Sequence, residues 1–120
     1  MTESVTQTEQ KIAEDTLAFC MEHMQEHYTI QFLSQRAGIS PTKLKSIFRC
    51  TYGIPLFAYI RAEKMRLSAR QLAEANSRIL DIAEACGYDN ASKFSAAFRD
   101  VIGCSPKEYR KKYCKNVRSE

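Results

Sequence analysis

The amino-acid sequence predicts an all-α fold of seven helices, in which two helix-turn-helix subdomains are joined by a long connector helix. Three observations lead to this prediction. Tight turns are scarce, because the 120 residues include only four glycines and three prolines. Apolar residues recur at helical spacing, and no convincing strand is seen. The chain also repeats itself once, which indicates a duplicated helical unit.

The internal repeat matches residues 30–39 with residues 79–88 at an offset of 49. After one extra residue the offset becomes 50, and residues 44–59 then match residues 94–109. Two copies are too few for a solenoid, because repeat arrays need three or more units to bury a continuous core. The repeat therefore predicts one supersecondary unit that occurs twice.

The first subdomain is expected over residues 9–55, after a flexible N-terminus at residues 1–8. An amphipathic helix from about Glu9 to His27 opens this subdomain. The apolar side of that helix consists of Ile12, Leu17, Phe19, Cys20 and Met24.

The first repeat copy predicts a helix, a sharp turn and a second helix. Thr29 is placed to cap a short helix that runs to about Ala37, and Gly38 suits the left-handed position that ends it. Ser40 caps the next helix, with Pro41 at its first position, where a missing N–H is tolerated. Two helices joined by a short glycine-containing turn are typical of a helix-turn-helix.

The connector is expected over residues 56–74, where a long helical pattern contains no glycine or proline. We interpret it as a stiff helix between the two copies. The second subdomain is expected over residues 75–113, and a frayed polar tail over residues 114–120.

The second repeat copy has matching signals. Ser77 is expected to cap its first helix, Gly87 to end it, and Asp89 or Asn90 to cap the next helix. The last helix is expected to begin after Ser105, where Ser-Pro-Lys-Glu is a capping box with proline at the first helical position.

Positive charge is unevenly distributed along the chain. Residues 1–27 contain one basic and six acidic residues, whereas residues 28–120 contain seventeen basic and eight acidic ones. A basic body indicates a polyanionic partner, although a solvated surface explains the charge equally well.

The cysteines and the hydropathy pattern indicate the cellular compartment in which the protein is expected. The five cysteines are odd in number and scattered, without a C-x-x-C pair. No signal peptide is present, and no apolar run reaches the roughly 20 residues needed to cross a bilayer. We expect a reduced, cytoplasmic protein with structural thiols and no membrane partner.

The second helix of each copy is the candidate DNA-reading helix, at about residues 42–51 and 91–101. In a helix-turn-helix this helix enters the major groove, where Lys, Ser and Thr can bond base edges and Ala can contact a thymine methyl. The base-reading candidates, left after removal of the inward-facing residues, are Thr42, Lys43, Lys45, Ser46, Ala91, Ser92, Ser95 and Ala96. For each of them the alternative is an ordinary solvated surface residue.

Phosphate contacts are expected from residues at helix N-termini, where exposed N–H groups attract anions, and from nearby cations. These candidates are Thr29, Arg49, Arg61, Ser77, Arg78, Lys93, Arg99, Ser105, Lys107 and Arg110. Plain solvation is the competing interpretation for each one.

Cys20, His23 and His27 share the spacing C-x₂-H-x₃-H on one expected helix. A structural zinc site needs a fourth ligand, and Cys20 lies on the apolar side, so helix packing is favoured and no metal is assigned. The chain contains no phosphate-binding glycine loop, nucleophile elbow or paired carboxylates. We therefore expect neither an enzyme nor a cofactor.

Residues 79–110, from Ile-Leu-Asp-Ile-Ala to Pro-Lys-Glu-Tyr-Arg, resemble the signature of AraC/XylS-type bacterial transcription regulators. Residues 38–49 resemble the less uniform first unit of that family, and the resemblance extends over residues 10–113. It implies a homeodomain-like AraC-type fold whose central helix holds two recognition helices in successive major-groove segments of an asymmetric promoter site. It also implies activation by contact with RNA polymerase, and many members carry an effector-binding or dimerisation domain.

The leading hypothesis is therefore a sequence-specific transcription regulator, expected to be an activator, whose partners are double-stranded promoter DNA and RNA polymerase. Several stand-alone members carry longer side chains at the positions of Ser46, Ala91, Ser92 and Ala96, so direct base readout is expected to be sparse. The alternative is a protein-interaction module of the same fold that antagonises or assists another regulator. A metal sensor built on Cys20, His23 and His27 is a remote third hypothesis.

Overall fold

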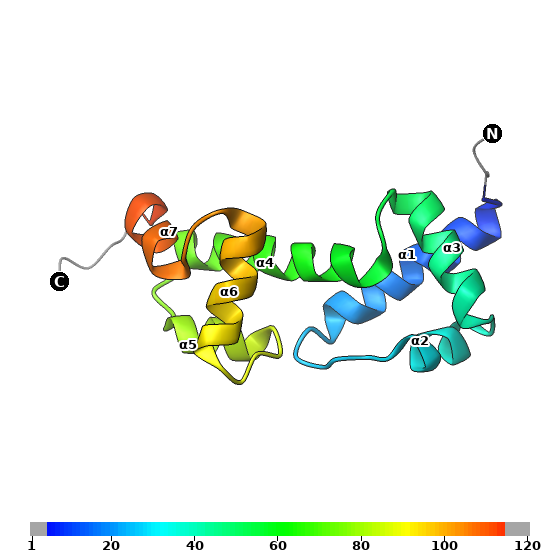
Figure 1. The fold of residues 1–120 in the computed structure, drawn as a ribbon, viewed down its shortest axis with the longest axis horizontal. Coiled ribbons are helices and arrows are strands. Elements are labelled where there is room, and N and C mark those ends of the chain that lie inside the picture. The colour runs from blue at the N-terminus through cyan, green and yellow to red at the C-terminus, as the bar shows by residue number, and fades with distance from the viewer. Residues whose placement is uncertain (1–4, 115–120) are drawn as a thin grey trace. The chain divides into compact units, whose positions relative to one another are not determined.

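The computed structural model of the chain describes residues 5–114, which form seven helices and no strand (Figure 1). This confirms the predicted fold class. The helices are α1 (Gln7–Glu22), α2 (Ile30–Ala37), α3 (Pro41–Tyr52), α4 (Leu56–Glu74), α5 (Ile79–Ala85), α6 (Ala91–Ile102) and α7 (Pro106–Tyr113). Among the described residues, none of these helices combines the length and apolar character needed to cross a bilayer.

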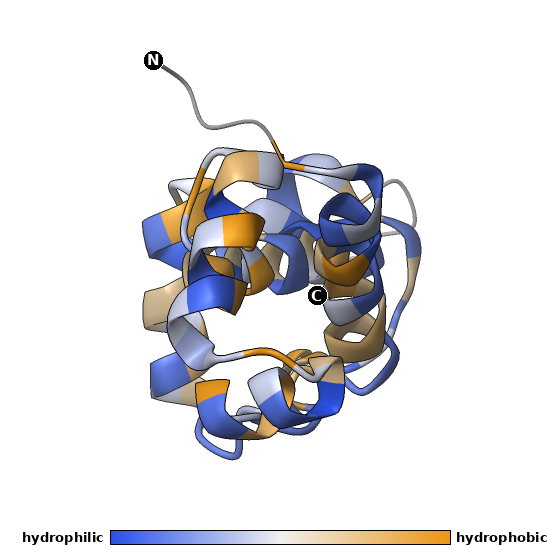
Figure 2. Ribbon diagram, turned by 90° about the vertical axis from the view of Figure 1, so that its right-hand side faces the viewer, coloured by the Kyte–Doolittle hydropathy of each residue, from blue (hydrophilic) through white to orange (hydrophobic). Residues whose placement is uncertain are grey.

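The chain divides into two compact units, and the division falls after Ile60, inside α4. The first unit contains α1, α2, α3 and the beginning of α4. The second contains the rest of α4 together with α5, α6 and α7. Figure 2 shows hydrophobic and hydrophilic residues following one another along the helices nearest the viewer, as expected for helices that bury one side.

The core of the first unit is formed where α1, α2 and α3 meet. Leu33 from α2 and Leu44 and Phe48 from α3 are almost completely buried. They pack against Ala13 and Cys20, which lie on the buried side of α1. This packing determines which face of α3 remains exposed.

The core of the second unit has the same plan. Phe94 and Phe98 of α6 are completely buried and pack against Met65 and Leu72 of α4 and Ile82 of α5. Burial of a Phe side chain stabilises a fold by about 1.5–3 kcal/mol.

The internal repeat is also visible in the packing geometry. In the first unit, the rings of Phe48 and Tyr59 lie 5.7 Å apart at an interplanar angle of 75°. In the second unit, the corresponding rings of Phe98 and Tyr109 lie 5.6 Å apart at 79°. Edge-to-face contact of this kind is a favoured arrangement of aromatic pairs. The two copies therefore share a structural frame as well as a sequence pattern.

Several predicted helix caps are confirmed. Thr29 Oγ accepts a hydrogen bond from Phe32 N and caps α2, while Ser40 Oγ accepts one from Lys43 N and caps α3, with 3.1 Å between the atoms in both cases. Gly38 ends α2 with a positive φ of 75°, a conformation that side chains with a Cβ disfavour. Of the two residues offered as the cap of α6, Asn90 is the one that caps it.

The first helix begins and ends earlier than expected. The helix begins at Gln7, two positions before the expected start at Glu9, because its N-cap Thr6 and Glu9 form a capping box that the sequence prediction missed. Residues 7 and 8, expected to be flexible, are therefore helical. The helix ends at Glu22 rather than near His27. His23 follows the last helical residue, and its Nδ1 lies 2.9 Å from the carbonyl oxygen of Phe19, one of the last carbonyls of the helix.

Two further cap predictions were wrong in detail. Arg78, not Ser77, is the N-cap of α5, and no side-chain hydrogen bond caps that helix. The helix begins at Ile79, which packs on the core beside Ile82. At α7, Ser105 accepts from the backbone N–H of Glu108 as expected, but the Glu108 carboxylate lies 3.6 Å from Arg99 instead of closing the capping box.

Candidate nucleic-acid interface

The exposed face of α3 follows from the burial of its other face. Since Leu44, Ile47 and Phe48 lie in the core, the helix presents the opposite side chains to solvent. These exposed side chains are Thr42, Lys43, Lys45, Ser46 and Arg49. Lys45 and Arg49 form no ion pair within the described part of the chain. Their charges are therefore available to an anionic ligand.

Lys43 differs from the other residues of this face. Its Nζ lies 2.8 Å from Glu9 Oε2, so a carboxylate from α1 accompanies this ammonium group. The hydrogen bond from Lys43 lowers the pKa of Glu9 below its ordinary value, and the backbone N–H of Thr6 acts in the same direction. This contact joins residues far apart in sequence, and no local sequence signal predicted it.

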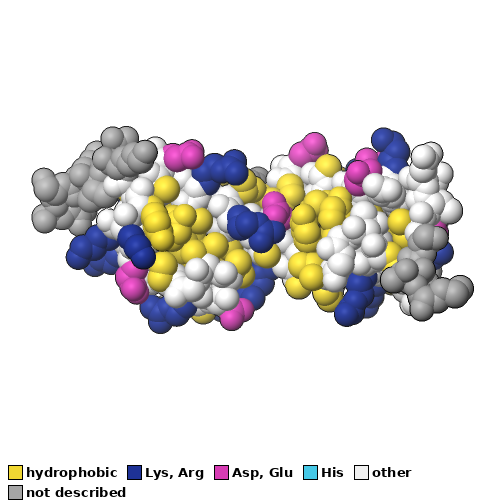
Figure 3. All heavy atoms as spheres, turned by 90° about the horizontal axis from the view of Figure 1, so that it is seen from above, with side chains coloured by type: hydrophobic (Ala, Val, Ile, Leu, Met, Phe, Trp, Pro, Cys, Tyr) yellow, Lys and Arg dark blue, Asp and Glu magenta, His cyan; other side chains and the backbone are white. Residues whose placement is uncertain are grey.

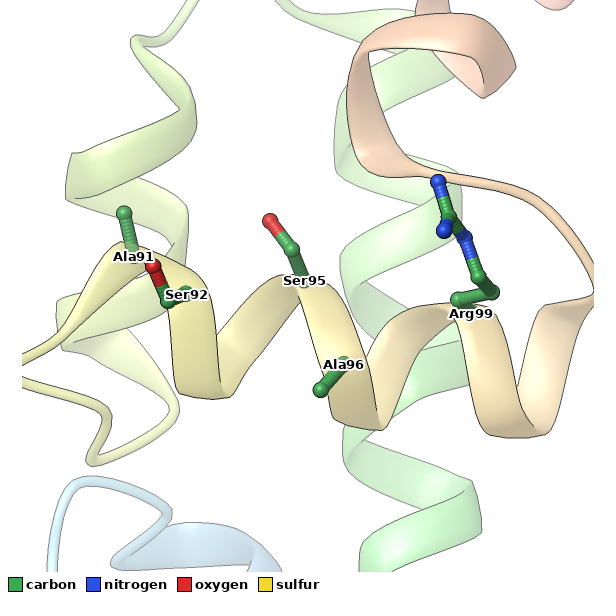
Figure 4. Close-up of a pocket in the computed structure, with 5 residues that line it drawn as sticks. All are labelled: Ala91, Ser92, Ser95, Ala96 and Arg99. Carbon is green, nitrogen blue, oxygen red and sulfur yellow. The ribbon is translucent and has the colours of Figure 1, made fainter.

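The exposed face of α6 is built from short side chains. Phe94, Ala97 and Phe98 point into the core, and the outer face forms a shallow hollow of about 390 Å³ (Figure 4). Ala91, Ser95 and Arg99 project from one side of the helix, with Ser92 and Ala96 on the neighbouring stripe; these five residues line the hollow. A face of this kind permits close approach of another surface.

The start of α6 is held by a side-chain cap. Asn90 Oδ1 accepts hydrogen bonds from the backbone N–H groups of Ser92, at 2.8 Å, and Lys93, at 3.1 Å. The Lys93 side chain is exposed beside the hollow-lining residues. The position of the helix start is thus fixed locally, and two N–H groups of the first turn are already bonded to Asn90.

Several cations expected to contact phosphate have carboxylate partners in the second unit. Arg61 Nη1 lies 2.7 Å from Asp100 Oδ2, and this hydrogen bond raises the pKa of the guanidinium further. Arg78 bonds Asp81 with two nitrogens, and Arg99 lies 3.6 Å from Glu108. Exposed pairs of this kind contribute only about 0–1 kcal/mol, so a phosphate can replace the carboxylate at small cost.

Arg110 occupies a different environment. Its Nε donates to the carbonyl oxygen of Leu72 at 3.2 Å, and its Nη2 donates to that of Ala75 at 3.0 Å. Leu72 lies in the last turn of α4 and Ala75 directly follows that helix, a place where backbone oxygens lack helical partners and a cation is favourable. The structure thus joins α7 to α4 through the side chain that the sequence marked as a phosphate contact.

The remaining phosphate candidates lie at or near helix starts. Thr29 and Ser105 are the N-caps of α2 and α7, and Lys107 is exposed on the first turn of α7. Ser77 is exposed but lies one residue before the N-cap of α5, so its hydroxyl does not mark the helix start. Within each unit, on the face drawn in Figure 3, basic side chains lie scattered among other residues.

Cys20, His23 and His27 do not lie together on one helix. Cys20 is buried in the first core, and His23 terminates α1 with its ring near a backbone carbonyl. His27 follows four residues later, beyond the end of the helix. Within residues 5–114, no three potential ligand side chains are grouped as a metal site would need.

Comparison with known proteins agrees with this geometry. Residues 33–112 match the family model described as a helix-turn-helix domain. An AraC-like transcription regulator of Streptomyces lividans is 36% identical over 84 residues, which cover 70% of this chain and 28% of the relative. The regulatory protein SoxS of Escherichia coli (strain K12) is 33% identical over 101 residues, which cover 84% of this chain and 94% of SoxS.

Another relative is named as an activator, and relatives differ in length. The transcriptional activator AarP of Providencia stuartii is 28% identical over 105 residues, which cover 88% of this chain and 78% of AarP. The chain spans between 28% and 42% of the length of three other relatives, including the S. lividans regulator. Four of these relatives are named as transcription regulators or activators, and SoxS is named as a regulatory protein.

Solved structures share the fold. The C-terminal domain of AraT, a response regulator from Geobacillus stearothermophilus, aligns with a TM-score of 0.81 at 24% identity, covering 91% of this chain and 93% of that one. The DNA-binding domain of AdpA, solved in complex with a target DNA, aligns with a TM-score of 0.77 at 24% identity, covering 84% and 91%.

Proposed function

The chain belongs to the AraC-type family of helix-turn-helix transcription regulators, and from this premise we propose that it binds promoter DNA sequence-specifically and activates transcription. The observation that carries the proposal is the exposed face of α3, where Lys45 and Arg49 stand beside Thr42 and Ser46 with the opposite face anchored in the core. Such a helix is suited to the major groove, because its side chains donate to base edges and phosphates.

On α3, we assign base reading to Thr42, Lys45 and Ser46. The Lys45 ammonium can donate to guanine O6 or N7, and the two hydroxyls can donate or accept. Arg49 lies two turns into the helix, so a phosphate contact suits it better than a base contact. Lys43 is kept as a candidate, although its partner Glu9 limits its freedom.

On α6, we propose that the helix itself lies close to the bases, because its short side chains cannot donate hydrogen bonds to distant base atoms. Ala91 and Ala96 can contact thymine methyl groups, and Ser92 and Ser95 can bond nearby acceptors. Arg99, together with Lys93 outside the hollow, would contact phosphates on either side of the groove. Few base atoms are reached in this way, so part of the specificity would come from DNA shape.

For contacts with the DNA phosphate backbone, we propose fewer residues than the sequence predicted. We keep the exposed cations and N-terminal caps, namely Thr29, Arg61, Arg78, Ser105 and Lys107. Ser77 is omitted because it lies outside α5, and Arg110 because its guanidinium bonds the end of α4. Phosphate contacts position a protein on DNA without reading its sequence.

We propose that α3 and α6 occupy successive major-groove segments of one asymmetric site, and that the bound chain also contacts RNA polymerase. This part of the proposal is supported by the family membership and by the two recognition helices within one chain. Several relatives are much longer than this chain.

The test is binding of the full chain to promoter fragments and to scrambled DNA, measured by fluorescence anisotropy over a range of salt concentrations. We expect a preference for particular fragments and an affinity that falls steeply with salt, because phosphate contacts release counterions. Equal affinity for all fragments, or affinity that ignores salt, would contradict the proposal.

A matched pair of variants sharpens the assignment of α3. Lys45→Ala should weaken binding and relax base preference in one half of the site by about 1–3 kcal/mol. Lys11→Ala removes the same charge from an exposed position on α1 and should leave base preference unchanged. A uniform loss across all sequences in Lys45→Ala would make Lys45 a phosphate contact.

The outer face of α6, with its short side chains, is also suited to contact with another protein. This supports the alternative of an interaction module that antagonises or assists another regulator. The two functions separate in a pull-down from sheared genomic DNA. Recovery of particular DNA fragments favours the proposed regulator, whereas recovery of no fragment, with RNA polymerase or another regulator co-purifying, favours the alternative.

A further inference from the structure

The side chain of Glu9 is fixed more firmly than that of an ordinary surface carboxylate. Its Oε1 accepts a hydrogen bond from the backbone N–H of Thr6 at 3.0 Å, and its own backbone N–H donates to Thr6 Oγ at 3.1 Å. The second oxygen, Oε2, lies 2.8 Å from Lys43 Nζ. The Glu9 side chain is only 23% exposed. The capping box thus holds a negative charge at one place beside α3.

The backbone of Lys43 is fixed at the start of α3. Its backbone N–H donates to Ser40 Oγ, so it lies in the first turn of α3, the part of a recognition helix that meets base edges. Both α1 and α3 contribute to the core of the first unit. The packing of α1 on α3 therefore brings the Glu9 carboxylate within reach of the Lys43 side chain, which is 55% exposed.

This arrangement affects binding to any phosphate backbone. Sequence-independent affinity depends on the number of cations that replace counterions around the phosphates. A phosphate that approaches Lys43 also meets the Glu9 carboxylate, so the pair contributes less than a lone lysine would. Base contacts by Lys45 and Ser46 do not involve the pair and should be affected less.

We propose that Glu9 is a selectivity residue: by holding Lys43, it lowers the affinity of α3 for DNA of any sequence and leaves discrimination to Lys45 and its neighbours. The inference rests on the proposed DNA-binding function. Its chemistry is a competition between one carboxylate and the phosphate backbone for one ammonium group.

Glu9→Gln is a sharp test, because glutamine can take the same place in a capping box while the negative charge is removed. Asp15→Asn is the matched control, since it makes the same charge change at an exposed position on the same helix. Both variants and the wild-type chain are titrated by anisotropy with a preferred fragment and with a scrambled fragment over a range of salt concentrations.

For Glu9→Gln we expect the affinity for scrambled DNA to rise about two- to fivefold, the range that an exposed ion pair can contribute. The affinity for the preferred fragment should rise less, so the ratio of the two falls. The slope of log affinity against log salt concentration should steepen by up to about the amount that one additional phosphate contact contributes. Asp15→Asn should leave the ratio unchanged.

A second comparison, made in chains that lack the Lys43 ammonium, separates the charge effect of Glu9→Gln from any change in the stability of α1. In Lys43→Gln chains, the further change Glu9→Gln should have no effect on the affinity ratio, because the ammonium that it releases is gone. An effect that persists without Lys43 would overturn the inference.

The outcomes also separate the inference from the function on which it rests. A wild-type chain that prefers a fragment, with a ratio unchanged in Glu9→Gln, contradicts the inference alone. A wild-type chain that binds both fragments equally contradicts the proposed function and the inference together.

Discussion

The two helix-turn-helix units place their positive charge differently. Residues 5–60 contain five basic and five acidic residues, yet α3 has Lys43, Lys45 and Arg49 and no acidic residue. Residues 61–114 contain eleven basic and seven acidic residues, yet α6 has only two basic residues, with Asp100 near them. The first unit thus concentrates its charge on the recognition helix, whereas the second carries it mainly on the surrounding helices.

This difference is confined to the surface, because the two cores share one plan. The Phe48–Tyr59 pair and the Phe98–Tyr109 pair have nearly the same separation and angle. Core residues set the orientation of each recognition helix, while its outer residues vary without disturbing that orientation. The same frame therefore carries a face with three basic residues on α3 and a face of mostly short side chains on α6.

The largest expected effect tests whether the two cores are equivalent. Phe48→Ala and Phe98→Ala each remove a completely buried ring, so each should lower the free energy of unfolding by about 3–5 kcal/mol. Chemical denaturation followed by circular dichroism measures the loss. Phe57→Ala, at a 45% exposed position on α4, should change stability by no more than about 0.5 kcal/mol. Markedly unequal losses for the two buried rings would contradict a shared frame.

The next effect distinguishes a structural from a DNA-binding role for Arg110. Arg110→Ala should lower the free energy of unfolding by about 1.5–3 kcal/mol, because two hydrogen bonds from a charged group to α4 carbonyls are lost. Denaturation and the salt dependence of DNA affinity are measured together. Lys111→Ala, at the exposed neighbouring position, serves as the comparison. Unchanged stability with a shallower salt dependence would restore Arg110 as a phosphate contact.

A smaller effect tests close approach at α6. Ala96→Leu places a larger side chain in the shallow hollow and should weaken binding to the preferred fragment about tenfold, or about 1.4 kcal/mol. Ala18→Leu makes the same change at an exposed position on α1 and should leave affinity within about twofold. Unchanged affinity in Ala96→Leu would show that α6 does not come close to the DNA.

The smallest effect concerns the buried thiol of Cys86, which lies 3.0 Å from Ser68 Oγ in the second core. Burial raises the pKa of this thiol, so its contribution to stability is complete below the pKa of an unfolded cysteine, about 8.5, and is lost as pH rises through the folded value. The loss should not exceed about 1.4 kcal/mol per pH unit. Denaturation at pH 7 to 10 should show this loss in the wild type and not in Cys86→Ala, whereas Cys50→Ala, at an exposed position, should behave as the wild type.

Most of the fold could be predicted from the sequence because its signals are local. Thr29 and Ser40 cap helices through N–H groups three residues away, and Gly38 meets a backbone requirement at its own position. The missed capping box at Thr6 and Glu9 was also local, and its Thr-x-x-Glu pattern could have revealed it.

The candidate interface was predicted less completely, because its details depend on tertiary contacts. The exposed face of α3 followed from the helical period, but the Glu9 carboxylate beside Lys43 comes from another helix. In the same way, Arg110 meets carbonyl oxygens of residues 72 and 75, which no local pattern connects to it. Charged residues can be counted in a sequence, but their partners depend on the fold.

We propose that α3 reads bases, while α6 lies close to the DNA and responds mainly to its shape. The most direct measurement is selection of bound sequences from a random DNA library by the full chain and by Lys45→Ala. We predict strong base preferences in one half of the selected site and weak ones in the other, with the strong half flattened in Lys45→Ala. Equal preferences in both halves, or a profile that Lys45→Ala leaves unchanged, would contradict this account.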